Sequence, residues 1–393
     1  NQRAYYTHGW ANKADKVKLN KQSVFEIGSI TKTMTALLLA EAVIQKKVSL
    51  NDHIDSLLPT DLKLKSPQAI TLKQLATHSS GLPRLPENQK NLFGKDPYAD
   101  YQRADLLEAI SDQVILKDKQ HYAYSNFGAG LLGEALAILN KDSYQNLLKK
   151  HVFEPLNMNN SYADASLVPD KLRVTGYSGQ YEASNWHFKA LAGAGSVNSS
   201  IEDLLTFGIA ILKADHPELK DAIKLSKQVH YQDRGVTVGL NWHINNGVIW
   251  HNGGTGGFRS MLMIDPTQNK VTAAITNSSE NSVEDIAGHL LDTKNEMKSY
   301  DFPVLISDAE LQAYVGDFHN KSNDKTIKTS VKDGHLMLQF PKQPAYRLTY
   351  LGQNKFIMKL TKTRIRFEIK NSGQFKQLYF KAWGDEQLYQ LVE

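Results

Sequence analysis

One long segment, residues 33–47, is apolar on nearly every face of the helix that it predicts. A helix of this kind is stable only when other elements cover it on all sides, so it must lie at the centre of a core. A chain of 393 residues can supply that cover, since it is about two to three times as long as a typical domain. Ser29 and Lys32 stand directly before this segment, so the sequence brings a hydroxyl and an amine to the start of a buried helix.

The Ser29-x-x-Lys32 spacing is typical of an activated serine. Residues i and i+3 share one helix face, so Lys32 can lie beside Ser29 and remove the proton that makes a serine hydroxyl a poor nucleophile. The unpaired N–H groups of a first helical turn favour the negative charge that then develops. The alternative is a capping serine with a surface lysine. A second copy, Ser322 and Lys325, lies in a polar stretch without a core helix after it.

A second pattern, Tyr124-x-Asn126, falls in a turn before a helix predicted over residues 127–139. A tyrosine near a lysine ammonium can have a lowered pKa and transfer protons at neutral pH, and an asparagine two residues on can bind a substrate carbonyl. The alternative is a buried tyrosine with a turn asparagine. The other copy, Tyr144 and Asn146, lies inside a predicted helix, where the two side chains would point to different faces.

A glycine-rich segment, residues 251–257, follows a strand predicted over residues 248–250. Glycines let a backbone approach a ligand closely, so the N–H groups of Gly254 and Ser29 can together hold an oxyanion. Each such donor lowers a reaction barrier by about 3 kcal/mol. A phosphate-binding loop is disfavoured because no Lys-Ser or Lys-Thr follows. A glycine-rich hairpin is the structural alternative.

In this order, Ser29-x-x-Lys32, Tyr124-x-Asn126 and His251-x-Gly253 resemble the three motifs of the serine β-lactamase and penicillin-binding-protein superfamily. The match is closest to the branch of class C β-lactamases, D-alanyl-D-alanine carboxypeptidases and related esterases. Residues 25–32, 77–83 and 193–203 also resemble this branch, and the resemblance covers about residues 7–290. It implies an α+β fold, in which helices flank an antiparallel sheet and a helical subdomain spans about residues 52–190.

The resemblance also implies a mechanism, in which Ser29 attacks a carbonyl, Lys32 and Tyr124 move its proton, and water releases the acyl-enzyme. Substrate-binding roles are implied or predicted for Asn126, His251, Gly253, Gly254 and Arg259. His251 would orient Tyr124 or a substrate carboxylate, and Arg259 would pair with a carboxylate or lie on the surface. The expected partner is a small molecule or a peptide, namely a β-lactam or a D-alanyl peptide. The alternatives are a carboxylesterase of the same family and a non-catalytic penicillin-binding-like scaffold.

Two features depart from the family pattern. His251 stands where class C β-lactamases typically have lysine, and histidine is more frequent there in peptidases and esterases, which disfavours efficient antibiotic hydrolysis. Family members usually carry a helix and a first strand before the segment that matches residues 10–18, whereas nine residues precede it here. We therefore expect a processed or trimmed start, with a targeting segment removed. A periplasmic or secreted protein is expected, with the cytoplasm as the alternative.

Composition excludes several other classes of function. The absence of cysteine excludes disulfides, thiolate nucleophiles and cysteine-based zinc sites, and the histidines show no metal-binding spacing, so no metal or cofactor is expected. The net charge is +5, and residues 301–393 contribute 14 basic against 10 acidic side chains. Such a mild excess is not typical of nucleic-acid binders. No apolar run is long enough for a transmembrane segment. The oligomeric state is left open.

Strand patterns dominate the rest of the chain. Residues 236–244, 248–250, 260–264 and 271–276 predict neighbouring antiparallel strands before a helix over residues 283–294, since no crossover helices separate them. Five further strand candidates lie between residues 336 and 392 and predict a small β-barrel domain over residues 301–393. This domain resembles the lipocalin-like appendage of some family members. No motif residue falls in it, so residues 1–300 form the predicted catalytic domain.

Overall fold

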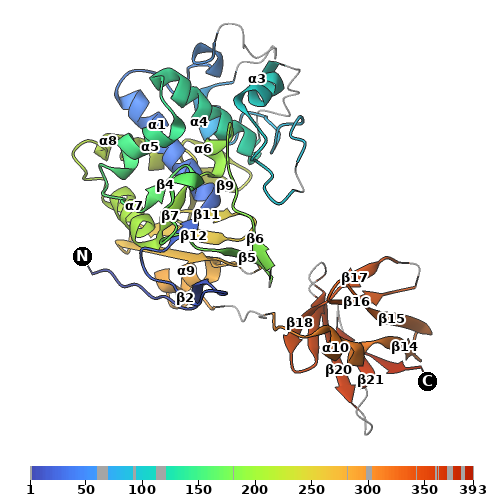
Figure 1. The fold of residues 1–393 in the computed structure, drawn as a ribbon. Coiled ribbons are helices and arrows are strands. Elements are labelled where there is room, and N and C mark those ends of the chain that lie inside the picture. The colour runs from blue at the N-terminus through green and yellow to red at the C-terminus, as the bar shows by residue number, and fades with distance from the viewer. Residues whose placement is uncertain are drawn as a thin grey trace. The chain divides into compact units, whose positions relative to one another are not determined.

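The computed structural model describes residues 2–59, 70–91, 94–111, 121–179, 181–280, 282–297, 303–341, 343–358, 361, 363–369, 375–381 and 386–392. The chain divides into two compact units, Asn1–Lys298 and Ser299–Glu393, each of which is described by itself. The larger unit combines antiparallel sheets with helices, and the smaller one is built around a single sheet (Figure 1). The predicted α+β class is therefore confirmed. The predicted boundary after residue 300 lies outside the described residues.

A six-stranded antiparallel sheet runs through the larger unit in the order β13-β12-β11-β10-β9-β8. Its strands are β8 (Tyr231–Asp233), β9 (Val236–Val238), β10 (His243–Asn245), β11 (Val248–Gly254), β12 (Arg259–Asp265) and β13 (Lys270–Thr276). Strands that follow one another in the chain are neighbours in the sheet, which confirms the predicted antiparallel pairing.

One predicted strand of this sheet is wrong, because residues 236–244 form two strands instead of one. Asn241 has a left-handed backbone with a φ of 53°, which an extended strand does not permit. A tight turn closes around it, in which the Gly239 N–H donates to the Trp242 carbonyl at 2.8 Å. The sheet therefore gains a hairpin, β9–β10, whose second strand leads into β11.

The remaining elements of the larger unit are mostly short. The helices are α1 (Thr31–Ile44), α2 (Leu72–Ala76), α3 (Arg103–Ser111), α4 (Asn126–Asn140), α5 (Tyr144–Leu148), α6 (Ala192–Gly195), α7 (Ile201–Lys213), α8 (Lys220–Lys227) and α9 (Glu284–Leu291). The strands are β1 (Trp10–Asn12), β2 (Val17–Lys18), β3 (Val24–Glu26), β4 (Ser161–Tyr162), β5 (Gly176–Ser178), β6 (Tyr181–Ala183) and β7 (Asn198–Ser200). β3, β7 and β4 form a second, three-stranded sheet, in which β3 leads into the turn before α1.

Helices cover both faces of the six-stranded sheet (Figure 1). Side chains alternate between the faces of a strand, so β12 contributes to two different cores. Leu262 and Ile264 lie in the main core with Phe207 of α7. Met261 lies in a smaller cluster with Ala287 of α9. In the same sheet, β11 and β12 contact the turn that leads into α1.

The helix α1 is the buried centre of the larger unit, as its apolar pattern predicted. Eleven of its 14 residues are buried. It begins at Thr31, two residues before the predicted start, because a 3-10 turn feeds directly into it. The threonines within it are satisfied by the backbone: the hydroxyl of Thr31 donates to the Gly28 carbonyl at 2.7 Å, and that of Thr35 to the Gly193 carbonyl at 2.8 Å. The same helix carries Lys32 into the core.

The smaller unit is a nine-stranded antiparallel sheet that is nearly closed into a barrel (Figure 1). Its strands are β14 (Gly316–Asn320), β15 (Lys325–Lys332), β16 (His335–Gln339), β17 (Ala345–Arg347), β18 (Thr349–Gly352), β19 (Lys355–Met358), β20 (Thr363–Ile369), β21 (Phe375–Lys381) and β22 (Gln387–Leu391). The two outermost strands, β17 and β18, are separated by Leu348 alone, so the edges of the sheet meet. Apolar side chains, among them Phe318 and Phe367, fill the interior. The predicted barrel-like sheet is confirmed.

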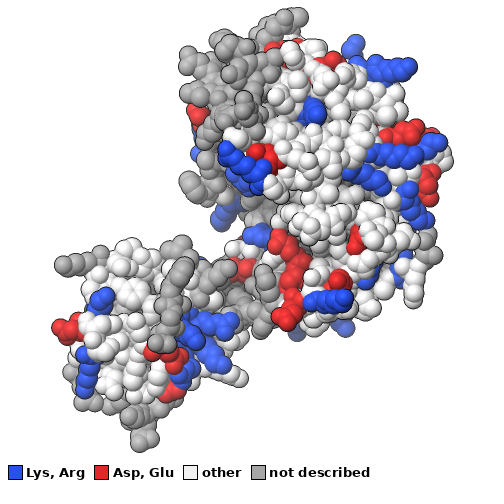
Figure 2. Space-filling model, turned by 180° about the vertical axis from the view of Figure 1, so that it is seen from behind, with Lys and Arg blue, Asp and Glu red and all other residues white. Residues whose placement is uncertain are grey.

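The face shown in Figure 2 is not dominated by side chains of one charge sign. Lysine and arginine lie interspersed with aspartate and glutamate over the face shown in Figure 2. Among the described residues on this face, the dense basic patch of a nucleic-acid binder is not seen. None of the described helices combines the length and the apolar character that crossing a bilayer requires.

Candidate active site

Ser29 lies on a tight 3-10 turn, Gly28–Ile30, that leads into α1. Gly28 has a left-handed backbone with a φ of 51°, and a Cβ on it would lie 2.8 Å from the amide nitrogen of Gly254. Only glycine permits both this conformation and this close approach. The turn therefore places Ser29 between the start of α1 and the end of β11.

Lys32 lies one helical turn beyond Ser29 and is fully buried. Its Nζ lies 2.9 Å from Ser29 Oγ and donates to the Ala194 carbonyl of α6 at 2.6 Å. Burial, reinforced by the charge of Arg84, lowers the pKa of Lys32 well below its ordinary value. Among the described residues, no carboxylate forms an ion pair that would restore the charge. The result is an amine with a lowered pKa within hydrogen-bond distance of the Ser29 hydroxyl.

Tyr124 meets the same hydroxyl from the loop before α4. Its ring centre lies 4.9 Å from Lys32 Nζ. Burial raises the pKa of Tyr124 to about 12, although its interaction with Ser29 opposes the rise. The lowered pKa predicted for a tyrosine beside a lysine ammonium is wrong, because burial of the phenol outweighs the nearby positive charge. Tyr124 is therefore a protonated phenol at neutral pH.

The loop that carries Tyr124 is fixed by His78. His78 Nδ1 accepts the Ser125 N–H at 3.2 Å, and its carbonyl accepts the Ala123 N–H at 2.8 Å. The rings of His78 and Tyr124 lie 4.4 Å apart. Burial lowers the pKa of His78 well below its ordinary value, so the ring acts as a neutral acceptor. Its contacts stabilise the loop and set the position of the phenol.

Asn126 opens α4 and has a buried side-chain oxygen without a hydrogen-bond partner among the described groups. Its Nδ2 donates to the Tyr98 hydroxyl at 3.3 Å, and its backbone N–H donates to the Arg84 carbonyl at 2.9 Å. Its Oδ1 is buried and has no hydrogen-bond partner among the described groups. A buried acceptor without a donor costs free energy, so this oxygen is suited to receive an N–H from a ligand.

The end of β11 packs directly onto the strand that precedes Ser29. A Cβ on Gly253 would overlap the Ile27 carbonyl oxygen, which also accepts the Ser260 hydroxyl at 2.8 Å. The backbone of β11 is thereby pressed against the segment that leads into the nucleophile turn. This contact brings the Gly254 amide to the turn that holds Ser29.

We expect Gly253→Ala to lower the free energy of unfolding by about 1–3 kcal/mol, because the added methyl forces β11 away from Ile27. Chemical denaturation measures this change. The control is Gly288→Ala in α9, where the nearest atom is 3.9 Å from the new Cβ and alanine favours the helix by up to about 1 kcal/mol. Equal stability of the two variants would contradict the close contact.

The geometry of the site agrees with the result of a comparison with known protein families. A protein-family model described as "Beta-lactamase" matches residues 1–294 of the 393. The chain belongs to the β-lactamase family. The resemblance drawn from the three motifs is therefore confirmed.

Curated relatives of this β-lactamase-family protein carry several names. A "Beta-lactamase" of Escherichia coli (strain K12) is 30% identical over 247 residues, and the match spans 61% of this chain and 62% of the relative. "D-alanyl-D-alanine-carboxypeptidase/endopeptidase AmpH" of the same organism is 26% identical over 291 residues, or 68% of this chain and 74% of the relative. "Penicillin-binding protein 4*" of Bacillus subtilis (strain 168) is 22% identical over 430 positions, covering 98% of this chain and 91% of the relative.

In this β-lactamase-family protein, His251 is a buried, neutral acceptor. Its Nδ1 lies 2.6 Å from the Asn252 carbonyl, so Nδ1 carries the proton and donates it. Its Nε2 is buried without a partner among the described groups. Burial lowers the pKa of His251 well below its ordinary value. A neutral ring with an unpaired lone pair on Nε2 can accept a hydrogen bond from a hydroxyl, but it cannot form an ion pair with a carboxylate.

The Arg259 side chain forms hydrogen bonds with the backbone at the end of the glycine segment. Its Nη1 donates to the carbonyls of Thr255 and Phe258, both at 2.7 Å. An Nη nitrogen has two hydrogens, so both are used inside the protein. Pairing with a substrate carboxylate, which the sequence suggested for Arg259, stays a prediction.

The second copies of the two motifs lie elsewhere. Tyr144 is buried on α5, where its hydroxyl lies 2.7 Å from that of Thr35. Ser322 belongs to the smaller unit and bonds to Asn320 in the turn after β14. Among the described residues, no three histidine, aspartate or glutamate side chains come together as metal ligands.

Sequence reasoning missed Arg84 and an aromatic cluster near Asn126. The ring of Tyr98 stacks on Phe188 at 4.2 Å and lies 5.3 Å from Trp186. Arg84 directly follows the family-like segment 77–83, and that adjacency was the available signal. The aromatic residues come from separate loops, so no local pattern joins them.

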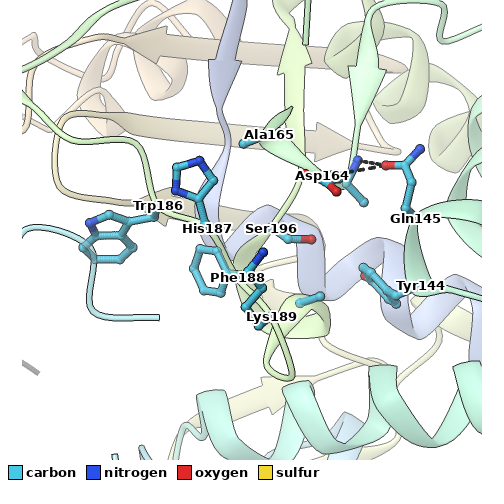
Figure 3. A pocket seen from close by; sticks show the side chains of 11 residues that line it. Tyr144, Gln145, Asp164, Ala165, Trp186, His187, Phe188, Lys189 and Ser196 are labelled. Atoms are coloured by element: carbon cyan, nitrogen blue, oxygen red, sulfur yellow. Dashed lines mark hydrogen bonds between the residues drawn. The ribbon is translucent and has the colours of Figure 1, made fainter. Parts of the chain in front are cut away.

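A separate pocket of about 140 Å³ opens beside α6 (Figure 3). It is lined by Tyr144, Gln145, Ala163, Asp164, Ala165, Trp186, His187, Phe188, Lys189, Ala192 and Ser196. The Ser196 hydroxyl is buried without a partner among the described groups. Ser29, Lys32 and Tyr124 do not line this pocket, so it is distinct from the candidate site.

Proposed function

We propose that this protein is a serine hydrolase that forms an acyl-enzyme on Ser29. One observation carries the proposal: Ser29 Oγ lies 2.9 Å from a buried Lys32 amine, whose Nζ lies 4.9 Å from the ring centre of Tyr124. A hydroxyl beside an amine of lowered pKa and a protonated phenol can be activated without a histidine. Membership of the β-lactamase family supports the same conclusion.

In the proposed acylation, Lys32 takes the proton of the Ser29 hydroxyl and Tyr124 gives a proton to the leaving group. As Oγ bonds to the substrate carbonyl carbon, the hydroxyl proton of Ser29 passes to Lys32 Nζ. The N–H groups of Ser29 and Gly254 receive the oxyanion. Tyr124 donates its proton to the leaving nitrogen, or to the oxygen of an ester, and recovers one from the Lys32 ammonium. Water then attacks the ester on Ser29, which releases the acyl group and restores the hydroxyl.

Among substrates, the proposal favours a β-lactam or a D-alanyl peptide. The unpartnered Asn126 Oδ1 is suited to the amide N–H that an N-acylated substrate carries. A carboxylesterase is the second candidate, because the neutral His251 provides no charge for the carboxylate of a β-lactam. A periplasmic or secreted location stays a prediction.

Three probes and one variant test the proposed function. The protein and Ser29→Ala are each incubated with a fluorescent penicillin, a chromogenic cephalosporin and a short-chain nitrophenyl ester. A label on Ser29 without turnover indicates a penicillin-binding protein, rapid cephalosporin turnover a β-lactamase, and ester turnover alone an esterase. Equal reactivity of Ser29→Ala, or no reaction of the wild type with any probe, contradicts the proposal and favours a non-catalytic scaffold.

A further inference from the structure

Arg84 is the exposed cation at the candidate site. Burial lowers the pKa of Lys32, His78 and His251 well below their ordinary values, which disfavours the charged form of each. Arg84 instead lies at the surface, where a guanidinium in contact with water stays charged. Arg84 is therefore an accessible positive group beside the buried groups of the site.

The backbone of Arg84 is fixed to the substrate-binding side of the site. Its carbonyl accepts the N–H groups of Asn126 at 2.9 Å and Phe127 at 3.1 Å, at the start of α4. Its guanidinium carbon lies 5.2 Å from the ring centre of Tyr124, a distance at which a cation and an aromatic face attract each other. Arg84 thus lies next to both the phenol at Ser29 and the asparagine with the unsatisfied oxygen.

The charge of Arg84 is not neutralised by the protein. Among the residues that the structure describes, no carboxylate pairs with this guanidinium and no carbonyl accepts its N–H groups, in contrast to Arg259. The charge still acts over the site. Burial raises the pKa values of Tyr98, Tyr122 and Tyr124, and the guanidinium partly offsets the rise at each. Its hydrogen-bonding capacity is left for a ligand.

We propose that Arg84 is a specificity-determining residue that selects substrates with a carboxylate on the acyl side of the reactive carbonyl. The inference rests on the proposed function, since it needs an acyl group that is transferred to Ser29 and lies along Asn126. A guanidinium can donate two parallel hydrogen bonds to one carboxylate, which fixes orientation as well as charge. The neutral His251 and the internally bonded Nη1 of Arg259 leave Arg84 best placed for this role.

A purely structural role makes a different prediction. If Arg84 only supported Tyr124 and lowered the pKa of Lys32, its removal would slow every substrate equally. Recognition of a carboxylate instead slows only the anionic member of a matched pair. The ratio of two rate constants therefore separates the two roles, even when the variant is generally less active.

The test uses pairs that differ in one charge on the acyl side: α-carboxybenzylpenicillin against benzylpenicillin, and the para-nitrophenyl monoester of adipic acid against its monoamide. The second-order rate constant of acylation is followed by the mass gain on Ser29 or by nitrophenol release. We expect Arg84→Gln to lower this constant about 10- to 100-fold for the members with the acyl-side carboxylate and to change it less than about threefold for the members without it. Arg84→Lys should keep part of the preference, and Arg84→Glu should reverse it.

Arg103→Gln is the matched control, because Arg103 is an exposed arginine on α3 that already pairs with Glu134. It should leave both rate constants unchanged. An equal loss for both members in Arg84→Gln, or a wild type without preference, overturns the assignment of Arg84 while Ser29 still reacts. A wild type that acylates no faster than Ser29→Ala on either pair overturns the proposed function instead, and the assignment of Arg84 with it.

Discussion

Ser29→Ala is expected to abolish covalent labelling by penicillin and to reduce turnover of any ester or β-lactam by about 10⁴-fold or more. The loss is large because Lys32 and Tyr124 have no proton to move once the hydroxyl between them is gone. Intact-mass spectrometry and nitrophenol release measure the two effects. Some turnover should remain in Ser29→Ala, because the N–H groups of the glycine segment can still stabilise an oxyanion.

Ser196→Ala provides the matched control for that experiment. Its hydroxyl is also buried and lies close in sequence to Ala194, whose carbonyl accepts the Lys32 amine, but it has no partner among the described groups. Its removal should leave labelling and turnover intact and should not lower stability, because no hydrogen bond of the described residues is lost. A penicillin label that persists in Ser29→Ala, on any other residue, would contradict the assignment of the nucleophile.

Lys32→Met is expected to slow acylation by about 10²- to 10⁴-fold, because the base is lost. The methionine side chain has a similar volume, so the packing around it is kept. The substitution is also expected to raise the free energy of unfolding at neutral pH. Burial lowers the pKa of Lys32 in the folded protein, so the unfolded chain binds more protons below pH 10.5, the ordinary value. Wild-type stability should therefore rise with pH relative to the variant. Denaturation at several pH values measures this difference.

The pH dependence of the reaction gives an independent check on Lys32. In the wild type, kcat/KM should rise with pH as the amine loses its proton, and the lowered pKa places this rise well below the ordinary range of a lysine. Lys32→Met should lack this limb. Lys32→Arg should also be inactive, since a guanidinium stays protonated. An unchanged acid limb in Lys32→Met would contradict the role of the amine as the base.

The order of the motifs was sufficient to predict the fold class, but the charge state of the site was not predictable from spacing. The i, i+3 relation predicts that Lys32 lies beside Ser29, and the structure places the two 2.9 Å apart. Whether the amine is charged depends on what covers it, and that cover comes from α6, far along the chain. The direction of the Tyr124 pKa follows from the same burial, which is why the sequence argument had the opposite sign.

The sequence pattern did not predict strands whose exposed face is rich in lysine and other polar residues. In β15, Ile327 and Thr329 are buried, while their neighbours Thr326, Lys328 and Ser330 are exposed, so the segment lacks the apolar content that marked the other strands. Arg84 shows the same limit for function. Its role depends on its approach to Tyr124, some forty positions away, and a lone arginine after a loop carries no pattern.

The burial of the groups around Ser29 has a consequence for ionic strength. Dissolved ions screen charges that are in contact with water, whereas buried groups feel little of them. Burial lowers the pKa of Lys32, His78 and His251 and raises that of Tyr124, so it disfavours the charged form of each, and bond-making at Ser29 should proceed at the same rate in dilute and concentrated salt. A salt effect limited to anionic substrates would belong to Arg84, and ionic strength would then separate recognition from chemistry without a mutation.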